Sequence, residues 1–184
     1  MRLVMMGTGT FGVPTFRSLF ESPHVVAALV TGPLKGKLEP GTPLNPMRDL
    51  AHEHGTPIFD PEDVNSEESR AGLRALDADL LVVCDYGEIL RPETLAAARL
   101  GGINLHGSLL PKYRGAAPVQ WAILCGETET GDSVTAPCPG RSTVASAVSL
   151  PRSGTSRASV SGPVQRRAVF CACGALPGVA RRTV

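Results

Sequence analysis

Short apolar runs alternate with segments of helical spacing along residues 1–134 of the chain. The run Leu80–Cys84 contains only apolar residues, which is typical of a strand that is covered on both faces of a parallel sheet. The predicted strands cover residues 3–6, 25–30, 57–59, 80–84 and 102–105. The predicted helices cover residues 14–20, 47–54, 66–76, 92–99 and 118–124. Strands that alternate with helices at these intervals predict an α/β fold, a Rossmann-like, doubly wound and mostly parallel sheet.

This alternation stops close to residue 134. From Thr135 to Val184 there is no sustained helical or strand period, prolines recur, and Asp, Glu, Lys, Asn, His, Ile, Met, Tyr and Trp are all absent. A segment of this composition buries too little apolar surface to compensate for the entropy lost on ordering. We therefore expect a folded domain at residues 1–134 and an unstructured tail at residues 135–184.

The charges divide at the same place. The formal net charge of the chain is +1, which does not indicate a protein that binds nucleic acid through a uniformly basic surface. All 17 Asp and Glu residues lie at or before Asp132, whereas the residues after it carry only Arg. The folded part is therefore acidic and the tail is basic.

Cysteine and histidine spacing gives no indication of a metal site. The five cysteines are odd in number, and only Cys171 and Cys173 form a close pair, so reduced thiols in the cytoplasm are expected. His52 and His54 are two residues apart and cannot share a helix face. The start of the chain lacks the features of a signal peptide, and no apolar run is long enough to span a bilayer. We expect a cytoplasmic protein without a metal or a membrane segment.

A glycine-rich turn follows the first predicted strand. Gly7, Gly9 and Gly12 fit the pattern Gly-x-Gly-x-x-Gly, which after a strand is typical of dinucleotide binding. The next strand, however, ends in Thr31-Gly32 and supplies no carboxylate for a ribose hydroxyl. The alternative is that small residues let the turn pack closely against the sheet, and we favour this interpretation.

Candidate chemistry lies at the end of the fifth predicted strand. Asn104 and His106 alternate with Ile103 and Leu105, so in a strand they point to the same face. The carboxyl end of a strand is where open α/β sheets bind ligands. An amide donor and an imidazole together suit a polarised carbonyl, although a His and an Asn with structural partners at a strand end is the plainer alternative.

The surrounding sequence resembles a known family. The run 104–111, Asn-Leu-His-Gly-Ser-Leu-Leu-Pro, and the run 114–118, Arg-Gly-Ala-Ala-Pro, resemble the motif of the 10-formyltetrahydrofolate-dependent formyltransferases. Gly107, where other branches typically have Pro, makes the match most similar to the branch that formylates the methionine of initiator tRNA. Residues 85–90, Asp-Tyr-Gly-Glu-Ile-Leu, resemble the family loop that holds the pterin ring, with Asp85 in place of the commoner Ala. The resemblance covers residues 1–134, and it favours the packing interpretation of the glycine-rich turn.

The resemblance implies a formyl transfer from 10-formyltetrahydrofolate, as cosubstrate, to the amino group of methionine on initiator tRNA. Asn104 and His106 match the catalytic residues that hold the oxyanion of the tetrahedral intermediate. The residues implied to bind folate are Tyr86, Gly87, Ile89, Leu90, Ser108, Leu109, Leu110 and Pro111. Lys35, Lys37 and Arg114 are implied to contact tRNA, and we expect a monomer.

One member of the implied site is missing from the sequence. The family carries a third catalytic residue, an Asp in a Gly-Leu-Asp-x-Gly loop, and its place falls near Ser142, where no acid occurs. We therefore expect this chain to be inactive as given. Because the tail lacks residues with A+T-rich codons, we interpret it as a frame-shifted translation of a G+C-rich gene. Two alternatives stay open: another folate-dependent formyltransferase acting on a nucleotide or sugar amine, and a non-enzymatic folate-binding fragment.

Overall fold

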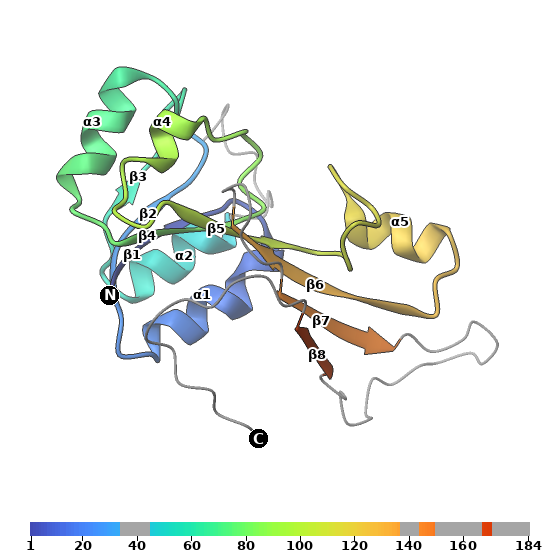
Figure 1. The fold of residues 1–184 in the computed structure, drawn as a ribbon. Coiled ribbons are helices and arrows are strands. Elements are labelled where there is room, and N and C mark those ends of the chain that lie inside the picture. Colours follow the sequence, from blue (N-terminus) through green and yellow to red (C-terminus); the bar gives the residue numbers. More distant parts are fainter. Residues whose placement is uncertain (34–44, 137–143, 150–166, 171–184) are drawn as a thin grey trace, which may run out of the picture. The chain divides into compact units, whose positions relative to one another are not determined.

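The structure is a computed structural model that describes residues 1–33, 45–136, 144–149 and 167–170. The chain divides into two compact units, Met1–His106 and Gly107–Val184. Each unit is described by itself below, and Figure 1 shows the elements of both.

The first unit is built on a parallel sheet. Its strands are β1 (Arg2–Met6), β2 (Val25–Val30), β3 (Ile58–Phe59), β4 (Leu80–Cys84) and β5 (Gly102–His106). They lie in the order β3-β2-β1-β4-β5, and every neighbouring pair is parallel. The chain builds outward from β1 to β3 and then returns to the other side of β1 with β4. The carboxyl ends of β1 and β4 therefore form the switch point at which such sheets bind ligands.

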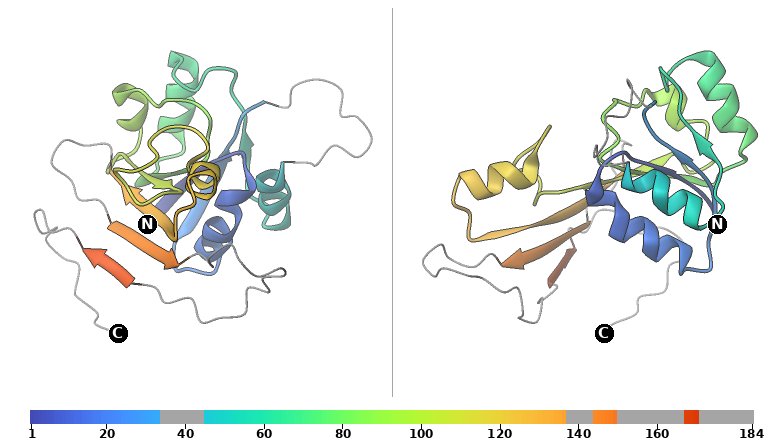
Figure 2. Two further views of the ribbon diagram at one scale, coloured as in Figure 1. Left: turned by 90° about the vertical axis from the view of Figure 1, so that its right-hand side faces the viewer. Right: turned by 180° about the vertical axis from the view of Figure 1, so that it is seen from behind.

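Helices cover both faces of this sheet. After a short 3₁₀ turn (Thr10–Gly12), α1 (Val13–Phe20) and α2 (Pro46–Glu53) lie on one side. The other side carries α3 (Glu67–Ala75) and α4 (Pro92–Leu95), and the two views in Figure 2 show the same division. The prediction of a doubly wound α/β fold is confirmed.

Alternation along β1 produces the two cores. Leu3 and Met5 are buried with Phe16 of α1 and Met47 of α2. Val4 and Met6 point the other way and are buried with apolar residues of the α3 side, Val64 and Leu73 among them. Strands that are buried on both faces carry continuous apolar runs, which is why the sequence predicted them well.

Local signals fix the starts of the helices. The Asn45 side chain accepts a hydrogen bond from the Met47 amide (3.0 Å) at the start of α2. The Ser66 hydroxyl accepts one from the Ser69 amide (3.1 Å) at the start of α3. Side chains of this kind satisfy amides that have no partner inside the helix.

One predicted helix is shorter than expected. The sequence predicted a helix over residues 92–99, but α4 ends at Leu95. The amides of Ala97 and Ala98 bond three residues back, and the amide of Arg99 donates to the Ala78 carbonyl (3.2 Å). These hydrogen bonds form tight turns and hold the chain against the residues just before β4. The next strand, β5, begins at Gly102.

The second unit contains α5 (Pro118–Leu124), β6 (Glu129–Thr135), β7 (Val144–Ser149) and β8 (Arg167–Phe170). The strands are antiparallel and lie in the order β6-β7-β8. The sequence analysis expected no strand in the tail, yet β7 and β8 fall inside it. Valine recurs along β7, which suits a strand even without the long apolar runs seen earlier in the chain. The expectation for the remainder of the tail lies outside the described residues and stays a prediction.

Candidate active site

The turn after β1 packs against the end of β4, at the switch point of the sheet. The Thr8 amide (3.1 Å) and the Thr8 hydroxyl (2.7 Å) both donate to the Asp85 carbonyl. A Cβ atom on Gly7 would lie 2.5 Å from the Cys84 carbonyl oxygen, and one on Gly9 would lie 1.9 Å from an Asp85 carboxylate oxygen. The glycines therefore allow close approach of two loops, which supports the packing interpretation of the Gly-x-Gly-x-x-Gly pattern.

Asp85, to which the sequence analysis assigned no role, contacts the glycine-rich turn through both its backbone and its side chain. Its backbone is left-handed (φ +52), a conformation that Asp tolerates better than most residues. The same residue gives its carbonyl to Thr8 and lays its carboxylate over Gly9. The left-handed backbone turns the chain out of β4 and into the loop that follows.

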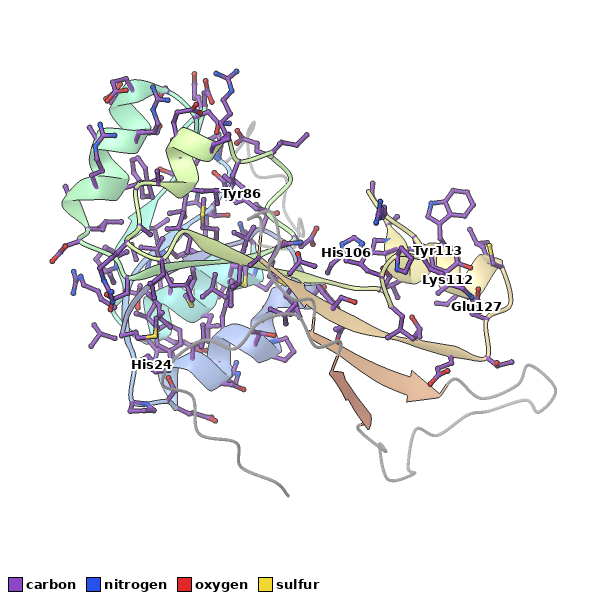
Figure 3. The ribbon with its side chains drawn as sticks, viewed as in Figure 1. His24, Tyr86, His106, Lys112, Tyr113 and Glu127 are labelled. Atoms are coloured by element: carbon purple, nitrogen blue, oxygen red, sulfur yellow. The ribbon has the colours of Figure 1, made fainter. Side chains whose placement is uncertain are left out.

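The loop after Asp85 has one buried anchor and an exposed tip. The Tyr86 side chain is buried in the core on the α3 side (Figure 3). Among the described residues its hydroxyl has no hydrogen-bond partner, and burial, with Glu88 and Asp63 nearby, raises the pKa of Tyr86 above its ordinary value. Ile89, by contrast, is 89% exposed. The tip of the loop is thus exposed, whereas the tyrosine ring lies inside the protein.

Asn104 and His106 lie on the neighbouring strand, β5. Ile103 and Leu105 pack against the core under α1 and α2, so Asn104 and His106 point to the opposite face. Both side chains are half-buried. The strand includes His106, one residue beyond the predicted end of the strand.

The register of the sheet places these side chains next to the loop after β4. Val83 is paired with Asn104 and Cys84 with Leu105, so Asp85 leaves β4 at the level of His106. The structure therefore brings Asn104, His106 and the loop of residues 85–90 to one carboxyl edge of the sheet, and their roles in catalysis and folate binding stay predictions. The first unit supplies an amide, an imidazole and backbone groups at this edge.

In the second unit, the loop that follows His106 is braced from within. The Ser108 side chain is buried, and its hydroxyl donates to the Lys112 carbonyl (2.8 Å). Ser133 of β6 is also buried; its hydroxyl donates to the Ser108 carbonyl (2.7 Å) and accepts from the Leu110 amide (3.0 Å). The Ser108 hydroxyl is thus engaged by its own loop, whereas the assignment of residues 108–111 to folate stays a prediction.

A second polar cluster of this unit lies at the end of α5. The Glu127 carboxylate accepts from the Lys112 ammonium (2.8 Å) and from the Tyr113 hydroxyl (2.7 Å). Figure 3 labels these three residues. Hydrogen bonds from Lys112 and Tyr113 lower the pKa of Glu127, and the bond to Glu127 raises the pKa of Tyr113. Arg114 is exposed. Lys35 and Lys37 lie outside the described residues, so their predicted contact with tRNA stays a prediction.

The described residues contain neither a metal-ligand cluster nor a membrane-spanning helix. No group of three or more His, Cys, Asp or Glu side chains is placed to hold a metal ion. No helix in the same ranges is long and apolar enough to cross a membrane.

Comparison with known proteins identifies the class of protein. The family described as formyl transferase matches residues 1–136, which is most of the chain. The chain belongs to the formyl transferase family.

The curated relatives point to one branch. A methionyl-tRNA formyltransferase of Rhodopirellula baltica is 52% identical over 139 residues, which cover 73% of this chain and 42% of the relative. A methionyl-tRNA formyltransferase of Methylococcus capsulatus is 47% identical over 133 residues, covering 71% of this chain and 43% of the relative. The chain thus spans less than half the length of the curated relatives it matches.

Solved structures support the fold. A phosphoribosylglycinamide formyltransferase from Bacillus halodurans aligns with a TM-score of 0.62 at 21% identity, over 84% of this chain and 83% of that one. The enzyme of the same name from Anaplasma phagocytophilum aligns with a TM-score of 0.65 at 20% identity, over 84% and 75%. At this level of identity the likeness concerns the fold alone.

Sequence reasoning missed the residues that support the site. Thr8 holds the loop after β4, and Ser133 holds the loop of residues 108–110, but single hydroxyl residues carry no periodic signal. Their partners lie 77 and 25 residues away in the chain. Only the sheet topology brings such pairs together.

Proposed function

We propose that the chain carries the formyl-binding part of a methionyl-tRNA formyltransferase, with 10-formyltetrahydrofolate as cosubstrate and initiator methionyl-tRNA as formyl acceptor. The observation that carries this proposal is the placement of Asn104 and His106 on one face of β5, beside the loop after β4. The 52% identity to a relative of that name supports the choice of acceptor. Translation initiation places such a chain in the cytoplasm, and we expect a monomer.

The proposed chemistry uses the two polar side chains of β5. The amine nitrogen of methionine attacks the formyl carbon, and the carbonyl oxygen becomes an oxyanion. The Asn104 amide and the His106 imidazole donate hydrogen bonds to that oxygen. When the intermediate collapses, the bond to N10 breaks, and N10 of the departing tetrahydrofolate takes up the proton that the amine has lost. Removing one oxyanion donor lowers the rate on the order of 10²–10³-fold.

Folate would lie along the carboxyl edge of the sheet. The loop of residues 86–90 supplies the slot for the pterin ring, chiefly through backbone groups, because the Tyr86 ring is buried. A flat heterocycle is held well by an apolar slot with a few fixed polar groups. Arg114, Lys35 and Lys37 would contact tRNA phosphates, and such contacts weaken as salt concentration rises.

The chain as given should not complete the reaction. No Asp or Glu follows Asp132, so the third catalytic residue implied by the family motif has no counterpart near Ser142. Loss of a group that handles protons costs on the order of 10²–10⁴ in rate. We infer that residues from about Thr135 onward are a frame-shifted translation.

The gene itself tests this part of the proposal. If a single-base shift after the codon for Val134 restores a Gly-Leu-Asp-x-Gly run within about a dozen codons, the interpretation holds. If all three frames lack such a run, the tail is the protein's own sequence and the interpretation fails.

A chimaera tests the function. Residues 137–184 are replaced by the corresponding remainder of the Rhodopirellula baltica relative, and formyl transfer is measured with 10-formyltetrahydrofolate and initiator methionyl-tRNA. We expect no transfer by the original chain, transfer by the chimaera, and a loss on the order of 10²–10³-fold on Asn104→Ala in the chimaera. A folded chimaera that formylates glycinamide ribonucleotide and not methionyl-tRNA would refute the proposed acceptor.

A further inference from the structure

Asn65 joins two segments that are distant in the chain. It lies in the turn before α3, and its side-chain amide donates to the Ile89 carbonyl (3.0 Å). Its side-chain oxygen accepts from the Arg91 amide (2.8 Å) and from the Thr94 hydroxyl (2.8 Å). Its own backbone amide donates to the Asp63 carboxylate (2.8 Å), which fixes the turn. Asn65 thus uses both ends of its amide group on one stretch of chain, residues 89–94.

That stretch includes the end of the loop between β4 and α4, and this loop has no regular secondary structure. Its first residue, Asp85, is held by Thr8, and its second, Tyr86, by burial of the ring. Its last residues, Ile89 and Arg91, are held by Asn65. Residues 87–89 form the exposed tip, in which the Ile89 carbonyl is anchored and the Ile89 side chain is exposed. Without Asn65, the end of the loop loses these hydrogen bonds and keeps the packing of Leu90 against the core.

We propose that Asn65 is a positioning residue that sets the conformation in which the loop of residues 85–91 receives the pterin ring. A binding loop that is fixed before the ligand arrives loses less conformational entropy on binding, so the affinity is higher. The Ile89 carbonyl is oriented by Asn65, and it belongs to the tip that carries the exposed Ile89 side chain. This inference rests on the proposed function, because it concerns the same folate site.

The side chain at this position must both donate and accept. The Ile89 carbonyl needs a donor, whereas the Arg91 amide and the Thr94 hydroxyl need an acceptor. Asparagine supplies both from one planar group, and aspartate supplies only the acceptor. Asn65→Asp therefore keeps the bonds to Arg91 and Thr94, and it replaces the donor that faces the Ile89 carbonyl with a carboxylate oxygen that repels this carbonyl.

The experiment compares three variants of the full chain, with tetrahydrofolate as the probe. Tetrahydrofolate carries the pterin ring but no formyl group, so its binding does not depend on the oxyanion donors of β5. Asn65→Ala removes all three side-chain bonds, and Asn65→Asp removes the bond to Ile89. The matched control is Thr94→Val, which removes a bond to the same Asn65 oxygen and leaves the loop untouched.

For each variant we measure three quantities. Calorimetry gives the affinity for tetrahydrofolate, thermal unfolding gives the stability, and hydrogen exchange gives the protection of the Arg91 amide. Asn65→Ala and Asn65→Asp should each weaken binding about tenfold, the effect of losing a hydrogen bond that fixes the site. Thr94→Val should change affinity less than about twofold while lowering stability by a similar amount to Asn65→Asp. The Arg91 amide should exchange faster in Asn65→Ala and keep its protection in Asn65→Asp.

Several results would overturn the proposal. If Asn65→Asp and Thr94→Val have equal affinity, Asn65 is only a structural residue. If Arg91 exchange is unchanged in Asn65→Ala, Asn65 does not hold the loop. A wild-type chain that binds no tetrahydrofolate would refute the proposed function instead, and Arg91 exchange would still decide whether Asn65 fixes the loop.

Discussion

Gly7 and Gly9 stand two residues apart in one turn, yet they face different obstacles. A side chain on Gly7 meets the backbone carbonyl of Cys84, which belongs to a buried strand and has no room to move. A side chain on Gly9 meets the carboxylate of Asp85, which is the far end of an exposed side chain. The same residue type is therefore needed for different reasons at the two positions.

The two glycines give a matched pair of variants. Gly7→Ala should lower the free energy of unfolding by about 1–3 kcal/mol, because the added carbon forces the turn away from β4. Gly9→Ala should cost less than about 1 kcal/mol, because the Asp85 carboxylate can swing aside. Urea unfolding measures both. Equal costs for the two variants would contradict this account of the turn.

Ser133 makes a second prediction at this scale. Ser133→Ala leaves the Leu110 amide and the Ser108 carbonyl without their shared partner, so the free energy of unfolding should fall by about 1–3 kcal/mol. The control is Ser18→Ala on the exposed face of α1, where a change within about 0.5 kcal/mol is expected. Urea unfolding of both variants tests this, and a Ser133→Ala variant as stable as Ser18→Ala would show that the brace is not needed.

At the scale of elements, Asp79 ties together the amino ends of two strands. The Arg2 amide, at the start of β1, donates to the Asp79 carboxylate (2.8 Å). The Asp79 amide donates back to the Arg2 carbonyl (2.7 Å), and the Arg99 guanidinium completes the group (2.7 Å). These bonds hold the pKa of Asp79 below its ordinary value, and the bond from the Arg2 amide has the largest effect.

This arrangement makes stability depend on pH in a defined direction. A carboxyl group whose pKa is lower in the folded state stabilises the protein above its unfolded pKa, and this stability is lost as pH falls through the folded pKa. The free energy of unfolding of the wild type should therefore fall in acid, below about pH 4. Asp79→Asn should flatten that fall, and Arg99→Gln should flatten it less, because the bond from Arg2 remains. Urea unfolding at several pH values measures this. Identical slopes in the wild type and Asp79→Asn would contradict it.

The elements also show what the sequence could and could not predict. β1, β2 and β4 were predicted within one residue, because strands buried on both faces leave continuous apolar runs. Asn104 and His106 were placed on one face by the two-residue period of a strand. The end of α4 was missed, because it is set by hydrogen bonds from Arg99 and Leu100 to the start of β4. Asn65 was missed for the same reason, since its partners lie 24 to 29 residues along the chain.

At the scale of the whole molecule, the family match and the α/β pattern end within two residues of each other. The family match covers residues 1–136, and the predicted alternation of strands and helices ends at residue 134. Asn104, His106 and the loop after β4 all lie before that point. We propose that the chain retains a folate site whose β5 residues recognise the formyl oxygen, and that it does not complete the reaction.

Anaerobic calorimetry with two ligands tests this claim most directly. The wild-type chain should bind 10-formyltetrahydrofolate more tightly than tetrahydrofolate, because Asn104 and His106 donate to the formyl oxygen. Asn104→Ala should reduce that preference about tenfold and leave the affinity for tetrahydrofolate unchanged. If the wild type binds neither folate, or if Asn104→Ala weakens both ligands equally, the claim is contradicted.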